Sequence, residues 1–241
     1  MSSSYFLLTK PTHTPVDKRE EDQIVYLNNR RIFILPEINL DYYVKHGLFE
    51  SHLIEWCKQF CRKDRVFLDI GAHTGTYSIS LADACREVVS FEPQRATYYA
   101  LCGSVCLSNL TNITCHHFGL GSEEQVGFQT LRIVSRDGGG STIQPTSDTV
   151  LREETIEIRT LDSLNLRDIG FVKMDVEENE LYVLQGAKTT LRTSGFPPIV
   201  FESNKETNLP LFGYIESELG YQIIKIGGCM NMYLATYPPR K

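Results

Sequence analysis

The chain lacks any apolar run as long as the roughly 18 residues that a membrane-spanning helix needs. Its first 22 residues also lack a basic segment followed by a sustained apolar stretch, which is the pattern of a secretory signal. With 241 residues, 41% of them hydrophobic and 22% charged, the composition is that of an ordinary globular protein. We therefore expect neither a membrane protein nor a secreted one.

An excess of positive charge is missing as well. The chain has 24 Lys and Arg residues against 30 Asp and Glu residues, which gives a net charge of −6. Short basic clusters occur at residues 29–31 and 62–65, but neither is long enough to follow a nucleic-acid backbone. The charge balance therefore makes nucleic acid an unlikely partner.

The seven cysteines lack the close spacing of a structural zinc site. Cys57 and Cys61 are four residues apart, as are Cys102 and Cys106, whereas such sites use tighter Cys-x-x-Cys pairs. A chain of this length can bury a core without disulfides, and an odd number of cysteines does not indicate a disulfide framework. We expect reduced thiols, no metal and a cytoplasmic location.

Short continuous apolar segments alternate with helical patterns along most of the chain. They predict strands at residues 66–70, 88–92, 113–117, 171–175, 198–202, 221–226 and 231–236. The helical patterns lie at about residues 48–60, 75–84, 95–109, 178–192 and 209–219. Because such strands form sheets that are covered on both faces, the predicted class is α/β. We expect a Rossmann-like, doubly wound, mostly parallel seven-stranded sheet with a C-terminal antiparallel hairpin at Gly227-Gly228.

Two regions stand apart from this alternation. Residues 126–133 and 155–160 alternate polar and apolar side chains like antiparallel strands, and a loop rich in Gly and Ser, residues 135–149, lies between them. They predict a small antiparallel insertion, at about residues 125–160, between strands three and four. Residues 1–46 are expected to form a loosely attached N-terminal extension, and residues 47–241 the main domain.

Acidic residues stand at the ends of four predicted strands: Asp69, Glu92, Asp175 and Glu202. In open α/β sheets, ligands bind beyond the carboxyl ends of the strands. A single carboxylate in such a place often caps a helix, but four of them after buried strands are hard to explain in that way. The set predicts a binding crevice.

The first strand runs into a glycine-containing turn at residues 69–76. In dinucleotide-binding turns, the middle glycine lets the backbone approach a pyrophosphate. Here His73 occupies the place of that glycine. This favours a nucleoside without a diphosphate over NAD or FAD. Glu92 lies 21 residues after Gly71, where a carboxylate accepts hydrogen bonds from both ribose hydroxyls.

Five segments, taken in order, make the chain closely resemble the FkbM-type methyltransferases. They are VFLDIGAHTGTYSISLA (66–82), VVSFEP (88–93), TLDSL (160–164), FVKMDVEENELYVLQGA (171–187) and PPIVFES (197–203). These relatives are class I enzymes that use S-adenosylmethionine, and most of them methylate hydroxyl groups of sugars and natural products. The resemblance extends over about residues 47–236 and implies the class I methyltransferase fold.

The resemblance also implies which residues contact S-adenosylmethionine. The expected set is Glu50, Asp69, Gly71, Ala72, His73, Gly75, Glu92, Pro93, His117, Phe118, Gly119 and Asp175. Within it, Asp69 and the glycines of the turn would surround the methionine half. Glu92 would bind the ribose, and residues 117–119 would border the adenine.

Methylation of an alcohol calls for a base that removes the hydroxyl proton. Asp175 is the first candidate, followed by Glu202 and Glu177. Lys173, two residues before Asp175, either steers its ionisation or packs its stem and reaches solvent. Glu178 stands where the family has a glycine, and a side chain makes a positive φ or a close backbone approach costly there.

These observations predict an O-methyltransferase that acts on a small hydroxylated acceptor, a sugar or glycoconjugate. The loop at residues 135–149 and residues 41–46 are candidate acceptor walls. Two alternatives stay open. Lys205 after the fifth strand would suit ribose 2′-O-methylation of RNA, although the acidic balance opposes it, and Glu178 suggests a non-catalytic binding domain.

Overall fold

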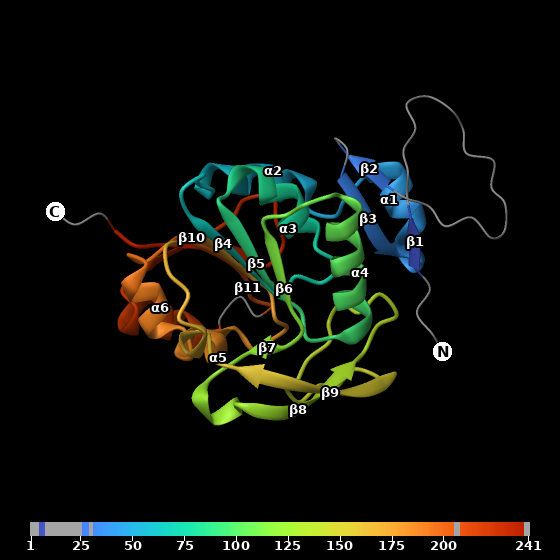
Figure 1. The fold of residues 1–241 in the computed structure, drawn as a ribbon. Coiled ribbons are helices and arrows are strands. Elements are labelled where there is room, and N and C mark those ends of the chain that lie inside the picture. The colour runs from blue at the N-terminus through green and yellow to red at the C-terminus, as the bar shows by residue number, and fades with distance from the viewer. Residues whose placement is uncertain (1–4, 8–25, 29–30, 205–207, 239–241) are drawn as a thin grey trace, which may run out of the picture.

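The computed structural model describes residues 5–7, 26–28, 31–204 and 208–238. Its centre is a seven-stranded sheet in the order β12-β13-β11-β10-β4-β5-β6 (Figure 1). The strands are β4 (Val66–Ile70), β5 (Glu87–Phe91), β6 (Ile113–His116), β10 (Ile169–Met174), β11 (Ile199–Glu202), β12 (Gln222–Lys225) and β13 (Met232–Thr236). The strands from β11 to β6 are parallel, whereas β13 runs antiparallel to both β11 and β12. The predicted mostly parallel sheet with a C-terminal antiparallel hairpin is confirmed.

Strand order reverses at the centre of this sheet. The chain proceeds from β4 outward to β5 and β6, and it later returns to β10 on the other side of β4. The connections that follow β4 and β10 therefore leave in opposite directions, and a crevice opens between them at the carboxyl ends of the strands. This reversal brings the turn after β4 next to Asp175, which follows β10.

Successive residues of the central strands pack into two different buried clusters, one on each face of the sheet. Phe67 and Phe171 belong to the cluster covered by α2 and α3, whereas Leu68 and Val172 belong to the cluster covered by α5, α6 and α7. Because both faces are covered, nearly every strand position is apolar, which explains the continuous apolar runs in the sequence.

The helices are α1 (Leu40–His46), α2 (Ser51–Cys57), α3 (Thr76–Leu81), α4 (Arg95–Leu107), α5 (Glu180–Gln185), α6 (Lys188–Thr193) and α7 (Leu209–Gly213). Short 3₁₀ helices lie at Glu37–Asn39, Lys58–Phe60, Ala82–Ala84, Glu123–Gln125 and Asp162–Leu164, and a π-helical turn at Tyr214–Glu218. Among the helices of the described residues, none is both long and apolar enough to cross a membrane.

One predicted helix, at about residues 178–192, is in fact two helices. The break falls at Gly186, where a Cβ atom would lie 2.1 Å from the carbonyl oxygen of Gly121. The second helix, α6, is capped from outside, because the Asp162 carboxylate accepts hydrogen bonds from the backbone N–H groups of Thr189 and Thr190. The helical pattern of the sequence was thus correct, but the close backbone contact that interrupts it is non-local.

The insertion forms a second sheet of β7 (Gly119–Leu120), β8 (Gly127–Ile133) and β9 (Arg152–Arg159). Strands β8 and β9 pair antiparallel and lie beside the main sheet (Figure 1). Leu131, Ile133, Ile156 and Ile158 form a buried cluster on one side of this pair. Leu131, Ile156 and Ile158 also line the cavity described below.

The N-terminal residues from Arg31 onward are firmly packed, so the expectation of loose attachment is wrong for residues 31–46. Strand β3 (Arg31–Pro36) pairs antiparallel with β1 (Tyr5–Leu7) and β2 (Tyr26–Asn28). Phe33 and Leu35 of β3 share a buried cluster with Tyr43 and with Ile79 of α3. The domain boundary at residue 47 remains a prediction from the sequence.

Two serines, Ser104 of α4 and Ser108 directly after it, hold β3 in place. The backbone N–H of Ile34 donates to Ser104 Oγ at 2.8 Å, and that of Ile32 donates to Ser108 Oγ at 2.8 Å. We expect Ser104→Ala to lower the free energy of unfolding by about 1–3 kcal/mol, because the Ile34 N–H loses its acceptor in a partly buried place.

Urea unfolding measures this change. The matched control is Cys106→Ala on the exposed side of the same helix, which should change the free energy of unfolding by less than about 0.5 kcal/mol. Equal effects of the two substitutions would contradict the proposed contribution of the Ser104 hydrogen bond.

Candidate active site

A cavity of about 260 Å³ lies at the carboxyl ends of β4, β5 and β10. Its walls come from four parts of the chain: the turn after β4, the end of β5, the segment that follows β10, and the insertion. Asn39, Tyr43, Phe49 and Glu50 of the N-terminal region complete the lining. The reversal of strand order thus produces the crevice predicted from the sequence.

The turn after β4 touches the segment after β10 directly. Gly71 has a φ of +78°, and a Cβ atom there would lie 1.8 Å from the carbonyl oxygen of Asp175. Glycine is therefore required for both its conformation and the close approach. The N–H groups of Gly71 and Ala72 both donate to the Phe91 carbonyl at 3.0 Å, which ties the turn to β5 as well.

Glu92 is buried beside this turn. Its carboxylate accepts hydrogen bonds from the backbone N–H groups of His73 (2.7 Å) and Gln94 (2.8 Å) and from the Thr97 hydroxyl (2.9 Å). Burial raises the pKa of Glu92, and His73 and these donors oppose that rise. Three of the roughly four lone-pair positions of the carboxylate are therefore used within the protein.

The structure divides the predicted cofactor residues into two groups. Those that line the cavity are Glu50, Gly71, Ala72, His73, Glu92, Pro93, Gly119 and Asp175. Those outside its lining are Asp69, Gly75, His117 and Phe118.

Asp69 lies fully buried below the turn and accepts a hydrogen bond from the backbone N–H of Ser78 at 2.9 Å. Its Oδ1 has no hydrogen-bond partner among the described residues, and burial raises its pKa. Gly75 precedes α3 with a φ of +88°, and a Cβ atom there would lie 2.4 Å from Leu101 Cδ1. Both residues shape the turn from below the cavity.

His117 and Phe118 lie on the far side of β5 from the turn. The His117 ring stacks on Tyr98 with 4.4 Å between centroids, and the buried Phe118 ring packs 5.7 Å from Phe91. Of the predicted adenine-bordering residues, Gly119 reaches the cavity lining. The neighbouring wall is instead apolar and comes from β8 and β9 of the insertion.

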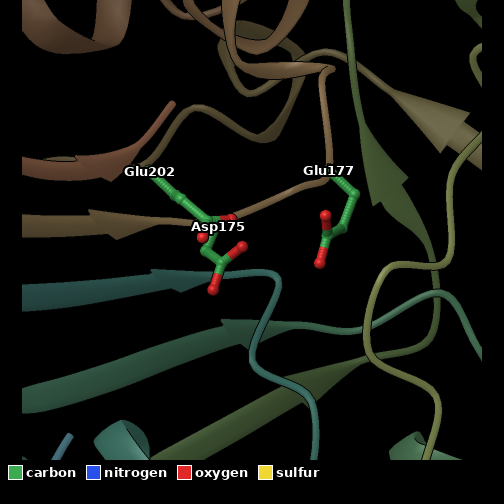
Figure 2. Close-up of side chains that lie close together, drawn as sticks. All are labelled: Asp175, Glu177 and Glu202. Atoms are coloured by element: carbon green, nitrogen blue, oxygen red, sulfur yellow. The ribbon is translucent and has the colours of Figure 1, made fainter. Parts of the chain in front are cut away.

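The three predicted catalytic acids gather at one place (Figure 2). Carboxylate oxygens of Asp175, Glu177 and Glu202 lie within 4.8 Å of one another. Burial raises the pKa of Glu202 to about 9, and the neighbouring Asp175 carboxylate adds to this rise. Burial would also raise the pKa of Asp175, but the Lys173 ammonium and a hydrogen bond with Glu202 hold it below its ordinary value. At neutral pH, Asp175 is therefore ionised and Glu202 is protonated.

Lys173 is buried and does not reach solvent, so the stem-packing interpretation of this residue is wrong. Its side chain is 5% exposed, and its Nζ donates to Asp175 Oδ2 at 3.3 Å and to the Gly71 carbonyl at 3.2 Å. Burial would lower the pKa of Lys173, but Asp175, Asp69 and Glu50 raise it above its ordinary value. Because this ammonium already supplies positive charge beside Asp175, we assign no metal to the three acids.

The turn between Asp175 and α5 has an unusual backbone. Glu177 and Glu178 have φ values of +53° and +73°. The position of the family glycine thus keeps a left-handed conformation although Glu178 occupies it, at a cost of roughly 1–2 kcal/mol. Glu180, the first residue of α5, is buried and accepts a hydrogen bond from the Val176 N–H at 3.0 Å. Burial raises the pKa of Glu180 to about 8.

The long loop of the insertion crosses the cavity and contacts both of its ends. We call residues 135–142 the strap. At one end, the Asp137 carbonyl lies 2.7 Å from His73 Nε2, and the Ser141 hydroxyl donates to Gln94. At the other end, the Gly140 N–H donates to the Glu177 carboxylate at 2.8 Å. The expectation that this loop contributes a cavity wall is consistent with residues 137–141, which line the cavity.

Several lining residues were not identified from the sequence. They are Asn39, Tyr77, Gln94 and Asn179. Gln94 directly follows the Glu92-Pro93 pair, so its neighbours in the sequence pointed to it. Asn39 reaches the cavity from the N-terminal region, Tyr77 from α3 and Asn179 from the turn before α5, and their placement depends on tertiary packing. Lys205, named for the RNA alternative, lies outside the described residues.

All seven cysteines lie in the described part of the chain, and each is free. Among the described residues, the groups of three or more potential metal-binding side chains include no cysteine. The expectation of a metal-free protein stays a prediction.

Comparisons with known proteins agree with this architecture. The model of the methyltransferase FkbM domain matches residues 69–223. Among curated proteins, none matches the chain. Among solved structures, the FkbM methyltransferase of Methylobacillus flagellatus KT is 23% identical with a TM-score of 0.53. The match covers 73% of this chain and 44% of that protein, so this chain corresponds to less than half of its length.

Two other similar structures are named for different reactions. Precorrin-6y C5,15-methyltransferase of Geobacter metallireducens GS-15 is 14% identical (TM-score 0.51; 80% of this chain, 92% of that one). Ribosomal protein L11 methylase of Lactobacillus delbrueckii subsp. bulgaricus is 11% identical (TM-score 0.51; 93% and 89%). At such identities the likeness shows the fold alone.

The raised pKa values of Glu202 and Glu180 predict that the protein loses stability as the pH rises from about 5 to about 9. Their folded-state pKa values of about 9 and about 8 exceed those in the unfolded chain, so the folded protein binds more protons in this range. The free energy of unfolding should therefore fall as the pH rises. Urea unfolding at several pH values measures this slope.

Glu202→Gln should make the slope shallower, because an amide does not titrate. The exposed Glu216→Gln on the π-helical turn serves as the control and should leave the slope unchanged. A wild-type stability that rises between pH 5 and 9, or an unaltered slope in Glu202→Gln, would contradict the assignment.

Proposed function

The chain belongs to the family of FkbM methyltransferase domains, and from this we propose that it transfers a methyl group to a hydroxyl oxygen of a small acceptor, a sugar or glycoconjugate. The observation that carries the proposal is the ionised Asp175 carboxylate, which is 30% exposed and lines the same cavity as Glu92 and the Gly71 turn. A base and a nucleoside-binding acid thus share one enclosed space.

S-adenosylmethionine is the cofactor of this methyltransferase. The cavity fits such a group, because it combines a buried carboxylate, an apolar wall from β8 and β9, and a turn where Gly71 has no room for a side chain. We assign Glu92 to the ribose, with one lone-pair position free for a hydroxyl rather than the two that the sequence suggested. Leu131, Ile156 and Ile158 would cover the adenine. When bound, the cofactor supplies an electrophilic methyl group on a sulfonium.

Asp175 is the proposed general base. During methyl transfer, the Asp175 carboxylate would accept the proton of the acceptor hydroxyl. The low pKa of Asp175 makes it a weak base, but it is ionised at neutral pH and the hydroxyl becomes acidic as the new bond forms. Protonated Glu202 stabilises the Asp175 carboxylate by a hydrogen bond. Of the other two candidate bases, Glu177 also lines the cavity, whereas Glu202 is outside the lining.

The remaining walls favour an uncharged, polyhydroxylated acceptor. Five acids line the cavity, Glu50, Glu92, Asp137, Asp175 and Glu177, and the charge of the lining Lys173 is already paired. Phosphate groups of RNA would be repelled there. Phe49 is partly exposed and stacks on Tyr42 with 4.0 Å between centroids, so the rim has an aromatic face suited to a sugar ring. A cytoplasmic location, proposed from the free thiols, belongs to the same hypothesis.

We expect the wild-type protein to bind S-adenosylmethionine and S-adenosylhomocysteine in isothermal titration calorimetry. Glu92→Gln should weaken both affinities by about 10- to 100-fold, because it removes a charged hydrogen-bond acceptor. The control is again the exposed Glu216→Gln, which should bind like the wild type. Absence of binding at millimolar cofactor would contradict the proposed site.

Asp175→Asn should lower turnover by about 100- to 10,000-fold, the range of general-base catalysis, and change cofactor affinity much less. The measurement is mass spectrometry of a panel of glycans incubated with isotopically labelled cofactor. Excess EDTA should leave transfer unchanged, since no metal is assigned.

The other outcomes of this experiment separate the alternatives. Unchanged turnover would dismiss Asp175 as the base. Label in RNA at the ribose 2′-oxygen would favour the RNA alternative. Cofactor binding with neither transfer to any acceptor of the panel nor slow hydrolysis of the cofactor would favour a non-catalytic domain.

A further inference from the structure

Lys173 is a buried cation on the central strand β10, at the point where the sheet meets the cavity. The residue is 4% exposed. Burying an ammonium group is costly unless it is paired and hydrogen-bonded. A lysine that served packing alone would extend its amine to solvent, so contacts inside the protein must account for its position.

Those contacts join the two segments that form the cavity floor. Lys173 Nζ donates to the carbonyl oxygen of Gly71, in the turn after β4, and to the carboxylate of Asp175, after β10. The backbones of the same two segments already touch, because the Asp175 N–H donates to the Ile70 carbonyl at 3.0 Å. Lys173 extends this link from the backbone to the Asp175 carboxylate.

The ammonium is also fixed from a third side. It lies 5.1 Å from the centre of the Tyr77 ring, and the Tyr77 hydroxyl donates to Glu50 Oε2 at 2.7 Å. Tyr77 belongs to α3, and Glu50 directly precedes α2. The turn after β4, strand β10 and helix α3 thus meet at one amine, and the Tyr77 hydroxyl links α3 to the residue before α2.

We propose that Lys173 is a positioning residue for methyl transfer. Its ammonium ties the Asp175 carboxylate to the Gly71 turn, so that the base and the turn beside the cofactor keep a fixed relative position. This inference rests on the proposed function, in which Asp175 is the base. Lys173 acts through Asp175 and the Gly71 carbonyl and takes no proton from the acceptor.

The electrostatic surroundings agree with this role. The charged and titratable groups that influence Asp175 and Lys173 come from every packed element: Glu202 from β11, Asp69 from β4, His73 from the turn, Glu177 from the segment after β10, and Glu50 with Tyr77 from α2 and α3. Most of these groups are acids. Removal of the ammonium would leave Asp175 beside Asp69 and Glu202 without a compensating charge.

The first experiment is a ¹³C NMR titration of the Asp175 carboxyl group without cofactor, assigned through Asp175→Asn. In the wild type its midpoint should lie below the ordinary aspartate value of about 3.9. In Lys173→Met it should rise by about one to three pH units, since an opposite charge at close range is lost. The control Lys188→Met removes an exposed lysine of α6 and should leave the midpoint unchanged.

The second experiment measures S-adenosylhomocysteine affinity in Lys173→Met, Asp175→Asn and the double variant. Lys173→Met should weaken binding at least tenfold through the displaced turn. Asp175→Asn keeps the Lys173 hydrogen bond to the Gly71 carbonyl, so it should change the affinity much less, and the double variant should bind as Lys173→Met does. An unchanged affinity in a folded Lys173→Met, or an equal Asp175 midpoint in wild type and Lys173→Met, overturns the proposal.

If Lys173→Met does not fold, ¹⁵N NMR of the wild-type lysine ammonium groups decides the question. The Lys173 signal should persist with slow solvent exchange and remain protonated above pH 10.4, the ordinary lysine value. Fast exchange, or deprotonation at the ordinary value, overturns the proposal. Failure of the wild type to bind S-adenosylhomocysteine overturns the proposed function itself, whereas normal binding by a folded Lys173→Met overturns the role of Lys173 alone.

Discussion

The pairing of one buried ammonium with several buried carboxylates is the interaction on which this site depends. Carboxylates at the ends of β4, β10 and β11 converge because parallel strands end at the same edge of the sheet. Without a cation nearby, carboxylates this close together would take up protons and lose their charges. Lys173 keeps Asp175 ionised, whereas burial and the neighbouring Asp175 carboxylate raise the pKa of Glu202 to about 9. Burial and one lysine thus leave two adjacent carboxyl groups in different protonation states.

The sheet could be predicted from the sequence because its signals are local. Strand β4 was predicted with its observed limits, Val66–Ile70, since a strand covered on both faces is apolar at nearly every position, and Asp69 is the one exception in β4. The same argument placed Asp175 and Glu202 at strand ends. The hairpin of β12 and β13 followed from Gly227-Gly228 between two short strands. In each case the deciding residues lie within a few positions of one another.

The cavity walls could not be predicted in this way, because they depend on contacts between distant segments. Nothing in the neighbourhood of Lys173 indicates that the Gly71 carbonyl, 102 positions away, accepts a hydrogen bond from its amine. The strap has the same character, since its Asp137 contacts Asn39 and His73. His117 and Phe118, expected to border the adenine, follow β6 and lie outside the cavity lining, whereas Leu131, Ile156 and Ile158 of the insertion line it. Local composition identified the floor of the site and the strap as a candidate wall, but not the contacts that hold the walls in place.

The turn at Glu177 and Glu178 shows how the inserted strap and the sheet depend on each other. Two consecutive left-handed residues are strained, and such a conformation persists only when its surroundings hold it. Here the strap provides this support, because the Gly140 N–H binds the Glu177 carboxylate and the Thr142 hydroxyl binds the Glu177 carbonyl. The glutamate at the family's glycine position is therefore compatible with a left-handed turn. Asp175 and Glu177 line the cavity from this turn, which supports the proposed catalytic site.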